Sequence, residues 1–425
     1  METHLAAWIK DTPDGKEAEA ILRTCVHCGF CTATCPTYLL LGDELDGPRG
    51  RIYLIKQMLE GADVSEVTQL HLDRCLTCRN CETTCPSGVR YGRLVDIGRG
   101  LVEKRVPRKG LDRIKRRLLL EVLPRSDLFG LAMKLGRLAR PFLPEALKEK
   151  VPPSAPALSW PGTRHARKML ALAGCVQRTM APNINAATAR VLDRLGIELI
   201  EAATAGCCGA LRYHLNEHED GLDDMRRNVD AWWPYVERGV EAIVMTASGC
   251  GVMVKEYRHL LRDDARYAAK AARISELTKD ACELLADQVE TLAAQQAEGW
   301  AEHLPKTIAF HSPCTLQHGQ QIRGVVEHLL SAVGFELHPV MDSHLCCGSA
   351  GTYSVLQPEL SGQLRENKLE NLEANGPQAI ATANIGCLTH LQGGTSTPVK
   401  HWIELLDARM SPATIQPVLE EQAPT

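Results

Sequence analysis

Eight cysteines near the amino terminus fall into two copies of one pattern. The first copy is Cys25, Cys28, Cys31 and Cys35, and the second repeats its intervals at Cys75, Cys78, Cys81 and Cys85. Soft thiolate ligands in sets of four suit iron–sulfur clusters or zinc. Three closely spaced cysteines can wrap one face of a cubane, while a fourth, set apart by an extra residue and followed by proline, points to the neighbouring cluster.

The pattern therefore predicts two 4Fe-4S clusters that share their cysteines across the two copies. The predicted ligands of the first cluster are Cys25, Cys28, Cys31 and Cys85. The predicted ligands of the second cluster are Cys75, Cys78, Cys81 and Cys35. The alternative is a pair of structural zinc sites, which is disfavoured because zinc modules usually separate their cysteines into pairs.

Several arginines lie close to these cysteines in the sequence. Arg23 and Arg74 precede the two copies, and the segment Gly-Pro-Arg-Gly-Arg at residues 47–51 lies between them. A positive charge beside a cluster favours its reduced state and would raise its reduction potential. The alternative is that each arginine is a solvated surface residue.

Eight further cysteines form two later sets, each with a single cysteine, a Cys-Cys-Gly (CCG) triplet and another single cysteine. The sets are Cys175, Cys207, Cys208 and Cys250, then Cys314, Cys346, Cys347 and Cys387. Each set could hold a metal or act in redox chemistry, whereas the alternative is reduced thiols that only pack. Adjacent cysteines cannot chelate one ion from a regular strand, so the triplet must be a tight turn whose glycine supplies the backbone freedom.

Other candidate side chains lie near the second of these sets. His311 and His318 flank Cys314, and we expect each to be a hydrogen-bonded loop histidine rather than a ligand. Three residues beyond the last cysteine stand Met253 in the first copy and His390 in the second, so no fifth thiolate closes either set. Cys282 lies in a helical pattern and is expected to be a small buried apolar residue.

The elements that position these later cysteines form an internal repeat. Each copy reads as a strand (168–173; 307–310), a cysteine, a helix, a second strand (197–200; 335–340), the CCG triplet, a helix and a third strand (242–246; 379–383) ending at Gly-Cys. Alternating strands and helices predict two α/β units with parallel strands, so the cysteines would lie at strand ends, where α/β sheets hold ligands.

The predicted fold class is therefore a multidomain α+β protein, a mainly helical two-cluster domain followed by two repeated α/β CCG units. The expected divisions are 1–104 for the helical domain, 105–162 for basic amphipathic helices and a proline-rich linker, 163–303 and 304–410 for the repeats, and 411–425 for a tail. Within the first domain, residues 51–61 and 64–72 read as helix.

The segment 105–150 is basic and amphipathic, with helices expected to break at Pro124 and Pro141. One interpretation is an interfacial surface drawn to anionic lipid or to a partner. The alternative is a solvated helix that packs on the first domain.

Composition excludes several classes of protein. The 425 residues carry 48 Lys and Arg against 52 Asp and Glu, a net charge of -4, which argues against a nucleic-acid binder. The longest nearly apolar run, 242–254, is too short to cross a bilayer. No export signal is visible at the amino end, so the 17 cysteines are expected to stay reduced in the cytoplasm, where metal ligation outranks disulfides.

The paired cysteine motifs and the CCG units occur together with two distinctive strings, PRGRI at 48–52 and LAGCVQRTMAPNINAATARVL at 172–192. In these features the chain resembles the iron–sulfur subunits of bacterial glycolate oxidase (glycolate dehydrogenase). The resemblance implies a ferredoxin-type domain with two 4Fe-4S clusters, and partner subunits that bind FAD and oxidise glycolate to glyoxylate. It also implies a membrane acceptor, quinone, and peripheral contact with the cytoplasmic face of the inner membrane. Alone, the chain would oxidise no substrate.

Similar layouts occur in anaerobic glycerol-3-phosphate dehydrogenase, lactate-utilisation proteins and heterodisulfide reductase. In heterodisulfide reductase the CCG unit ends in CxxC and carries a noncubane cluster, whereas CxxM and CxxH stand here. Two other functions compete with electron transfer: thiol or disulfide chemistry at the CCG units, and a scaffold with stabilising metals. The sequence has no GxGxxG after a strand and no phosphate loop, which favours electron transfer.

Overall fold

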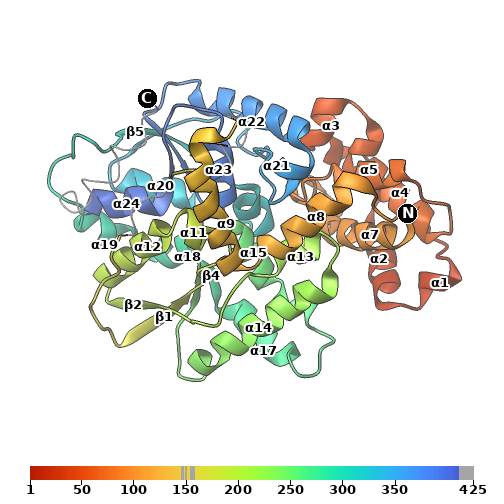
Figure 1. Ribbon diagram of the computed structural model, residues 1–425, viewed down its shortest axis with the longest axis horizontal. Helices are drawn as coiled ribbons and strands as arrows, with labels where there is room; N and C mark the ends of the chain where they lie inside the picture. The colour runs from red at the N-terminus through yellow and green to blue at the C-terminus, as the bar shows by residue number, and fades with distance from the viewer. Residues whose placement is uncertain (145–147, 149–150, 154–157, 411–425) are drawn as a thin grey trace.

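The computed structural model describes residues 1–144, 148, 151–153 and 158–410. A helical domain forms one end of the molecule, and the two α/β repeats form the other (Figure 1). The elements of the helical domain are α1 (Ala7–Lys10), α2 (Pro13–Thr24), η1 (Phe30–Thr32), α3 (Pro36–Leu41), η2 (Glu44–Asp46), α4 (Pro48–Leu59), α5 (Glu66–Asp73), α6 (Asn80–Thr84) and α7 (Tyr91–Arg105).

Short helices in this domain begin and end at the cysteine loops. The Thr12 side chain caps α2 by accepting a hydrogen bond from the Gly15 amide, and Cys25 follows the last residue of that helix. The helices predicted at 51–61 and 64–72 are confirmed as α4 and α5. Leu22, Ile55 and Leu94 are fully buried where α2, α4 and α7 meet, so α7 is the central helix against which both cysteine loops are held.

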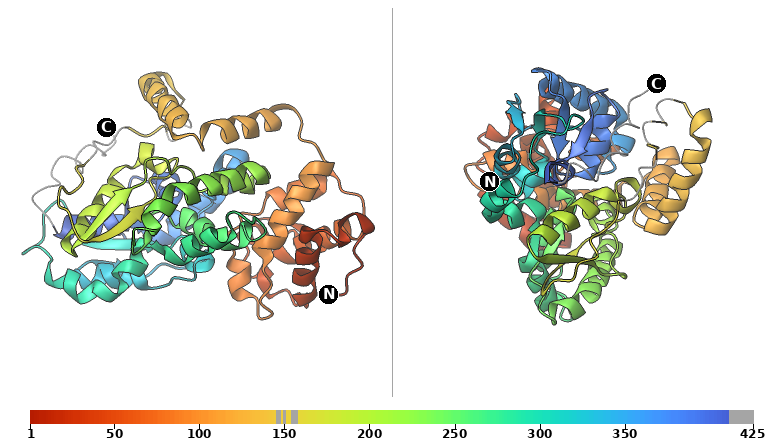
Figure 2. Two further views of the ribbon diagram at one scale, coloured as in Figure 1. Left: turned by 90° about the horizontal axis from the view of Figure 1, so that it is seen from below. Right: turned by 90° about the vertical axis from the view of Figure 1, so that its left-hand side faces the viewer.

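Two amphipathic helices follow and lie on the outside of the molecule (Figure 2). They are α8 (Gly110–Val122) and α9 (Ser126–Ala139), with a short turn η3 (Arg140–Phe142), so the breaks predicted at Pro124 and Pro141 are confirmed. Residues 151–153 and 158–161 form no helix or strand. The linker residues 154–157 and the predicted tail 411–425 lie outside the described part of the chain.

The first repeat contains a four-stranded parallel sheet. Its strands are β1 (Arg167–Ala171), β2 (Ile197–Glu201), β3 (Ile243–Met245) and β4 (Thr278–Asp280), in the order β2-β1-β3-β4. Its helices are α11 (Gln177–Met180), α12 (Asn183–Arg194), α13 (Ala210–His214), α14 (His218–Val236), α15 (Ser248–Lys255), α16 (Tyr257–Leu260), α17 (Ala268–Leu277), α18 (Ala281–Leu285), η4 (Ala286–Gln288) and α19 (Val289–Ala294).

The second repeat has the same sheet. Its strands are β5 (Thr307–His311), β6 (Glu336–His338), β7 (Ala379–Thr382) and β8 (Val399–His401), in the order β6-β5-β7-β8, again parallel. Its helical elements are η5 (Thr315–Gly319), α20 (Val325–Ala332), α21 (Tyr353–Leu356), α22 (Pro358–Glu373), α23 (Ile385–Gln392) and α24 (Trp402–Met410). The predicted repeat is confirmed, but each sheet gains a fourth strand that the sequence did not predict.

The two repeats share one hydrophobic core. A single buried cluster includes Ala171 from the first sheet and Leu330 and Trp402 from the second repeat. The His401 ring donates from Nε2 to the carbonyl of Thr246 at 2.9 Å, across the boundary between the repeats. In the described part of the chain no helix meets the length and apolarity that a bilayer span requires.

Candidate metal centres

The two cysteine loops of the helical domain have the same backbone conformation. Positive φ values occur just before and just after the second cysteine of each loop, at His27 (59°) and Gly29 (88°), then at Thr77 (53°) and Arg79 (59°). Three of these four residues carry a side chain, for which this conformation is unfavourable. The surrounding helices thus force both loops into one shape, as expected for two sites that hold the same kind of group.

The first predicted ligand set lies together. Cys25, Cys28, Cys31 and Cys85 all line one small pocket, against Pro48 and Ile52 of α4. Burial and the neighbouring thiols, Cys25 first among them, raise the pKa of Cys31 to about 11. With this raised pKa the Cys31 thiol stays protonated at neutral pH. Metal binding must displace the thiol proton, so Cys31 becomes a thiolate only when a cation is bound.

The second predicted set is gathered in the same way. Cys81 lies in the electrostatic field of Cys78, Cys75 and Cys35, and burial together with these thiols raises its pKa well above the ordinary value. Cys75, Cys81 and Cys35 are buried. The structure thus brings the four cysteines of each predicted set together, including Cys85 in the first set and Cys35 in the second. The assignment of individual ligands stays a prediction.

One of the arginines singled out in the sequence is a buried neighbour of the second set. Arg51 is 1% exposed, and its guanidinium lies 4.0 Å from the Cys35 sulfur. It also donates to the His71 carbonyl at 2.7 Å and lies 3.5 Å from an Asp46 oxygen. Arg74 donates to the other Asp46 oxygen at 2.8 Å. These contacts fix Arg51 in place, so its charge acts on the sulfurs through a poorly solvated medium.

The other arginines are more exposed than Arg51, although Arg49 lines the pocket of the first set and Arg74 pairs with the buried Asp46. The Arg23 side chain is 65% exposed and pairs with Glu19 at 2.9 Å, while Arg49 pairs with Glu44 at 2.5 Å. The interpretation as solvated arginines therefore holds for Arg23, whereas Arg51 is a buried positive charge beside the second set.

Sequence reasoning missed a second buried arginine, Arg99 of α7. It donates to the Leu72 carbonyl at 2.7 Å and to the Thr77 hydroxyl at 3.0 Å, and it also donates to the Cys75 carbonyl. Burial alone would raise the pKa of Cys75, but the charges of Arg51 and Arg99 lower it below its ordinary value. No sequence signal marked Arg99, because its contact with the loop depends on how α7 packs.

The CCG triplets form the tight turns that were predicted. Gly209 and Gly348 both have φ of 88°. A Cβ atom at Gly209 would lie 2.7 Å from the Gly221 carbonyl oxygen, and one at Gly348 would lie 2.6 Å from the Ser361 carbonyl oxygen. The glycine therefore serves both the backbone conformation and the close approach of a helix.

In each repeat the four cysteines follow the carboxyl ends of parallel strands and form a run of neighbouring sulfurs. Cys207 interacts with Cys175 and Cys208, and Cys208 with Cys250. In the second repeat the Cys314 and Cys346 sulfurs are 3.8 Å apart, and Cys347 interacts with Cys346 and Cys387. Both runs place thiols at the sheet edge where ligands bind in α/β folds. The metal or redox role of these cysteines stays a prediction.

The two histidines beside Cys314 have different environments. His318 interacts with the Thr83 hydroxyl at 3.1 Å and the His344 carbonyl at 2.9 Å, as expected. The expectation for His311 is wrong: it is 2% exposed, and within the described residues neither ring nitrogen has a hydrogen-bond partner. Burial, then Lys368 and His390, hold the pKa of His311 well below its ordinary value, so the ring is neutral. Cys282 is fully buried in the shared core, as predicted.

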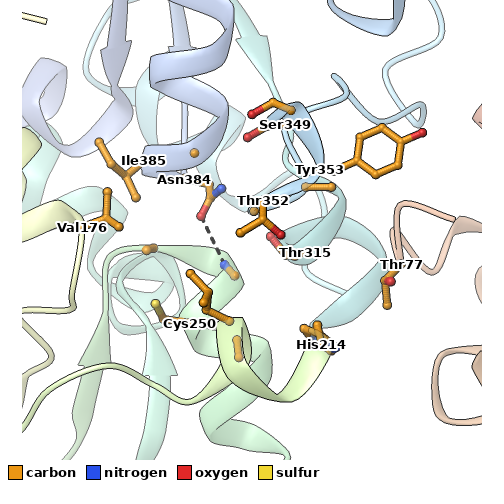
Figure 3. Close-up of a pocket in the computed structure, with 18 of the residues that line it drawn as sticks. Thr77, Val176, His214, Cys250, Thr315, Ser349, Thr352, Tyr353, Asn384 and Ile385 are labelled. Atoms are coloured by element: carbon orange, nitrogen blue, oxygen red, sulfur yellow. Dashed lines mark hydrogen bonds between the residues drawn. The ribbon is translucent and has the colours of Figure 1, made fainter. Parts of the chain in front are cut away.

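A cavity of about 530 Å³ lies where the helical domain and the two repeats meet. Its wall includes Cys78, Cys250 and Cys314, one from each of these three parts. Figure 3 shows Thr77, Cys250 and Asn384 around this space, with the Gly249 amide donating to Asn384 Oδ1 at 3.3 Å. Its size is typical of sites for small molecules or cofactors. Leu119 of α8 and Leu123, the residue that follows this helix, also line it.

The second cysteine set packs directly on the second repeat. Cys78 and Cys314 both lie against a small apolar cluster that contains Leu76, Cys346 and Tyr353. The Tyr353 hydroxyl donates to the Arg74 carbonyl at 3.2 Å across this contact. The cavity and this contact bring the second set close to the CCG sulfurs.

This architecture defines a class, two-cluster iron–sulfur proteins with twin cysteine-rich domains. The family model for a 4Fe-4S dicluster domain matches residues 21–89, and the cysteine-rich domain model matches residues 169–255 and 308–392. The amino-terminal domain thus carries two 4Fe-4S clusters.

Similarity to characterised proteins narrows the class. The glycolate oxidase iron-sulfur subunit of Escherichia coli (strain K12) is 56% identical over 409 residues, which cover 96% of this chain and 98% of that protein. The probable glycolate oxidase iron-sulfur subunit of Bacillus subtilis (strain 168) is 30% identical, over 88% of this chain and 89% of that protein. Lactate utilization protein A of Bacillus subtilis is 28% identical over 55% of this chain. The chain belongs to the family of glycolate oxidase iron–sulfur subunits.

Proposed function

We propose that this chain is the electron-transfer subunit of a glycolate oxidase complex. In this proposal FAD-binding partner subunits oxidise glycolate to glyoxylate, and the chain passes the electrons through its two clusters to a membrane acceptor, quinone. The observation that carries the proposal is the packing of Cys78, from the second cysteine set, against the cluster that contains Cys314 and Cys346 of the second repeat. The ligands of the relay are the eight cysteines assigned from the sequence.

Electrons would enter at the first cluster. Cys28 is exposed, and it is flanked by Val26 and Phe30, which are 68% and 61% exposed. Large apolar side chains exposed beside a cluster ligand suit a docking surface for a redox partner, because docking brings the donor close to the cluster. The FAD-binding subunit is the partner that this surface fits.

Electrons would leave on the opposite side of the relay, through the cavity. Most of its wall is apolar, and Cys78 and Cys314 both contribute to it. A quinone ring is an apolar ligand with two carbonyl oxygens, which fits a pocket with a few polar groups such as Asn384 and Thr315. The helices α8 and α9 cover this side of the molecule, with Leu119, Leu123 and Phe129 facing the cavity.

The outer faces of α8 and α9 fit the surface of an anionic membrane. Exposed apolar side chains lie on them: Leu111, Ile114, Leu118, Leu128, Leu131, Leu135 and Leu138. Phe142 of η3, which follows α9, is exposed too. Exposed cations stand among these residues: Arg113, Lys115, Arg117 and Lys134. An apolar stripe with flanking cations favours the interface of an anionic bilayer. We therefore propose peripheral binding to the cytoplasmic face of the inner membrane through these two helices.

Replacing Cys78 by serine in the assembled complex tests the relay. We expect the flavin to remain reducible by glycolate while quinone reduction falls by at least about tenfold, because the second cluster loses a ligand. Cys282→Ala, a buried cysteine outside both sets, is the matched control and should retain turnover. Normal glycolate-to-quinone turnover in the Cys78→Ser complex would reject the relay. The thiol-chemistry alternative requires instead that Cys346→Ser and Cys347→Ser limit the rate and Cys78→Ser does not.

Liposome sedimentation tests the membrane surface. The variant Arg113→Glu, Lys115→Glu, Arg117→Glu should bind anionic vesicles at least about tenfold more weakly, since each surface cation contributes about 1 kcal/mol. Arg116 is left intact because it pairs with Asp73 at 3.2 Å. The matched control reverses three cations elsewhere: Arg23, Arg273 and Lys306. Equal vesicle binding by both variants would exclude this face as the membrane contact.

A further inference from the structure

A histidine and two cysteines meet at the sheet edge of the second repeat, apart from the ferredoxin-type clusters. His311 ends β5, Cys347 lies in the CCG turn, and Cys387 lies in the first turn of α23. One ligand atom of each, a ring nitrogen and two sulfurs, lies within 4.8 Å of the other two. All three residues are buried, with exposures of 2%, 1% and 5%.

The unpaired ring of His311 calls for a partner that the described chain does not supply. Neither Nδ1 nor Nε2 has a hydrogen-bond partner there, although both atoms are buried. A buried polar group without a partner costs about 1–3 kcal/mol, so such groups in native proteins usually bind something else. A neutral imidazole next to two thiols is a ligand set for a soft or borderline metal ion.

We propose that His311, Cys347 and Cys387 bind a single divalent metal ion, zinc by preference. Zinc bonds measure about 2.3 Å to sulfur and about 2.0 Å to nitrogen, so the donor atoms of a tetrahedral site lie about 3.5–3.8 Å from one another. The three ligand atoms here lie within 4.8 Å of one another, so a shift of about 1 Å or less would bring them to zinc-binding distances. Three protein ligands leave one coordination position for a further ligand, as in open zinc sites. A cubane instead needs its thiolates on separate iron atoms, which spreads the donors apart.

The surroundings of the three residues support ligation. Asn384 donates from Nδ2 to the Cys387 sulfur at 3.5 Å, a contact of the kind that orients metal ligands. Lys368 is 2% exposed, and its ammonium donates to the Asp342 carbonyl at 2.6 Å while its charge faces Cys347 and Cys346. Cys387 also forms part of the cavity wall, so the ion would lie at the edge of the cavity.

The first repeat is an internal comparison. Leu172 stands at the position that corresponds to His311, so the first repeat lacks the nitrogen ligand. Among the described residues the other three-donor group is Asp43, Asp46 and His71, and there Asp46 is already paired with Arg51 and Arg74. The proposed site is therefore specific to the second repeat and independent of the electron-transfer proposal.

Elemental analysis of the anaerobically purified chain with its clusters intact tests the site. We expect about eight iron and about one zinc per chain. His311→Ala should lose the zinc, with at least about tenfold weaker binding, and keep its iron and the EPR signal of the reduced clusters. His318→Ala is the matched control, a histidine of the same segment with hydrogen-bond partners, and should keep the zinc. Cys387→Ser, close in size to the native side chain, should lose the zinc as His311→Ala does.

Cobalt gives a second measurement that does not depend on activity. Protein stripped of zinc and loaded with Co²⁺ alone should show thiolate-to-cobalt charge-transfer absorption, which His311→Ala and Cys387→Ser should lose and His318→Ala should keep. The proposal is overturned by wild-type protein that takes up neither zinc nor cobalt. It is equally overturned by His311→Ala protein that retains the bound metal, or by iron beyond eight per chain that survives that substitution.

Discussion

Arg51 places a positive charge beside the second cysteine set. It is 1% exposed and is held by the His71 carbonyl and by Asp46, with its guanidinium 4.0 Å from the Cys35 sulfur. Asp46 also pairs with Arg74, so one carboxylate is shared by two guanidinium groups. These three side chains together carry a net positive charge near the sulfurs. A fixed cation stabilises the more negative, reduced cluster. We therefore expect Arg51 to raise the reduction potential of the second cluster.

Arg51→Gln should lower the reduction potential of the second cluster. Loss of a charge at this distance amounts to about 2–4 kcal/mol at an effective dielectric constant of about 20, on the order of 100 mV for one electron. Potentiometric EPR titration measures the shift, and Arg51→Lys, which keeps the charge, should recover most of it. Arg23→Gln, at an exposed position, is the control. An unchanged potential in Arg51→Gln, with both clusters present, would refute the tuning role.

The glycine of the second CCG turn should tolerate no side chain. Gly348→Ala would place a Cβ atom 2.6 Å from the Ser361 carbonyl oxygen, at a φ of 88°. We expect a loss of about 2 kcal/mol or more in the free energy of unfolding, read as a lower midpoint of unfolding in guanidinium. Gly362→Ala in α22 is the control, since its Cβ would meet nothing within 4 Å and the helix should gain up to about 1 kcal/mol. Equal midpoints for Gly348→Ala and the wild type would disprove the steric argument.

Helix α7 is one of the elements that join the helical domain to the first repeat. Its Asp96 is 3% exposed and accepts a hydrogen bond from His214 of α13 at 3.1 Å. Arg93, one turn earlier, donates to the Tyr213 hydroxyl at 3.2 Å and pairs with Glu17 of α2 at 3.2 Å. Buried charged pairs fix one orientation but leave a costly unpaired group when one partner is removed. The contacts of α7 therefore contribute to how the helical domain is oriented on the first repeat.

Asp96→Asn should weaken this contact. Burial alone would raise the pKa of Asp96, but His214 and Arg93 lower it to about 2 from 3.8. A lowered pKa stabilises the folded protein above the unfolded pKa, and this contribution disappears as the pH falls toward about 2. At about pH 5.5 we expect the variant to lose about 2 kcal/mol, seen as a lower guanidinium midpoint. Glu2→Gln, at an exposed site, is the control, and an Asp96→Asn midpoint equal to that of the wild type would contradict the prediction.

The order of elements could be predicted from the sequence because local spacing determined it. The cysteine intervals predicted which sulfurs lie together, and the apolar runs predicted three of the four strands in each repeat. The fourth strands, β4 and β8, are three residues long and have polar or charged residues, so their pattern resembles a loop. They pair with β3 and β7 only once the repeat has folded.

The parts of the site that escaped prediction depend on tertiary contacts. Arg99 lies far along α7 from the cysteine loop whose carbonyls it binds, and nothing in its neighbourhood marks it. His311 and His318 look alike in sequence, yet only His318 has hydrogen-bond partners among the described residues. The partners of His311 in the proposed site, Cys347 and Cys387, come from separate loops at the sheet edge.

In the molecule as a whole, the cysteine sets extend from an exposed surface to the cavity between the helical domain and the two repeats. Cys28 of the first set is exposed beside Phe30, whereas Cys78 of the second set faces Cys314 of the second repeat. The helices α8 and α9 lie on the outside of the molecule (Figure 2). Leu119 and Phe129 of these helices line the cavity, whereas other apolar side chains of both helices are exposed. This layout separates the surface that would accept electrons from the side that would release them, as a relay requires.

The most direct test follows both clusters by EPR in the anaerobically purified complex with its partner subunits. Addition of glycolate should produce the signal of two interacting reduced 4Fe-4S centres, and addition of quinone should then remove it. The Cys78→Ser complex should turn over slowly and show no such interacting pair. Full glycolate-to-quinone turnover by a complex whose chain lacks iron, or whose clusters never change their signal, would contradict the account.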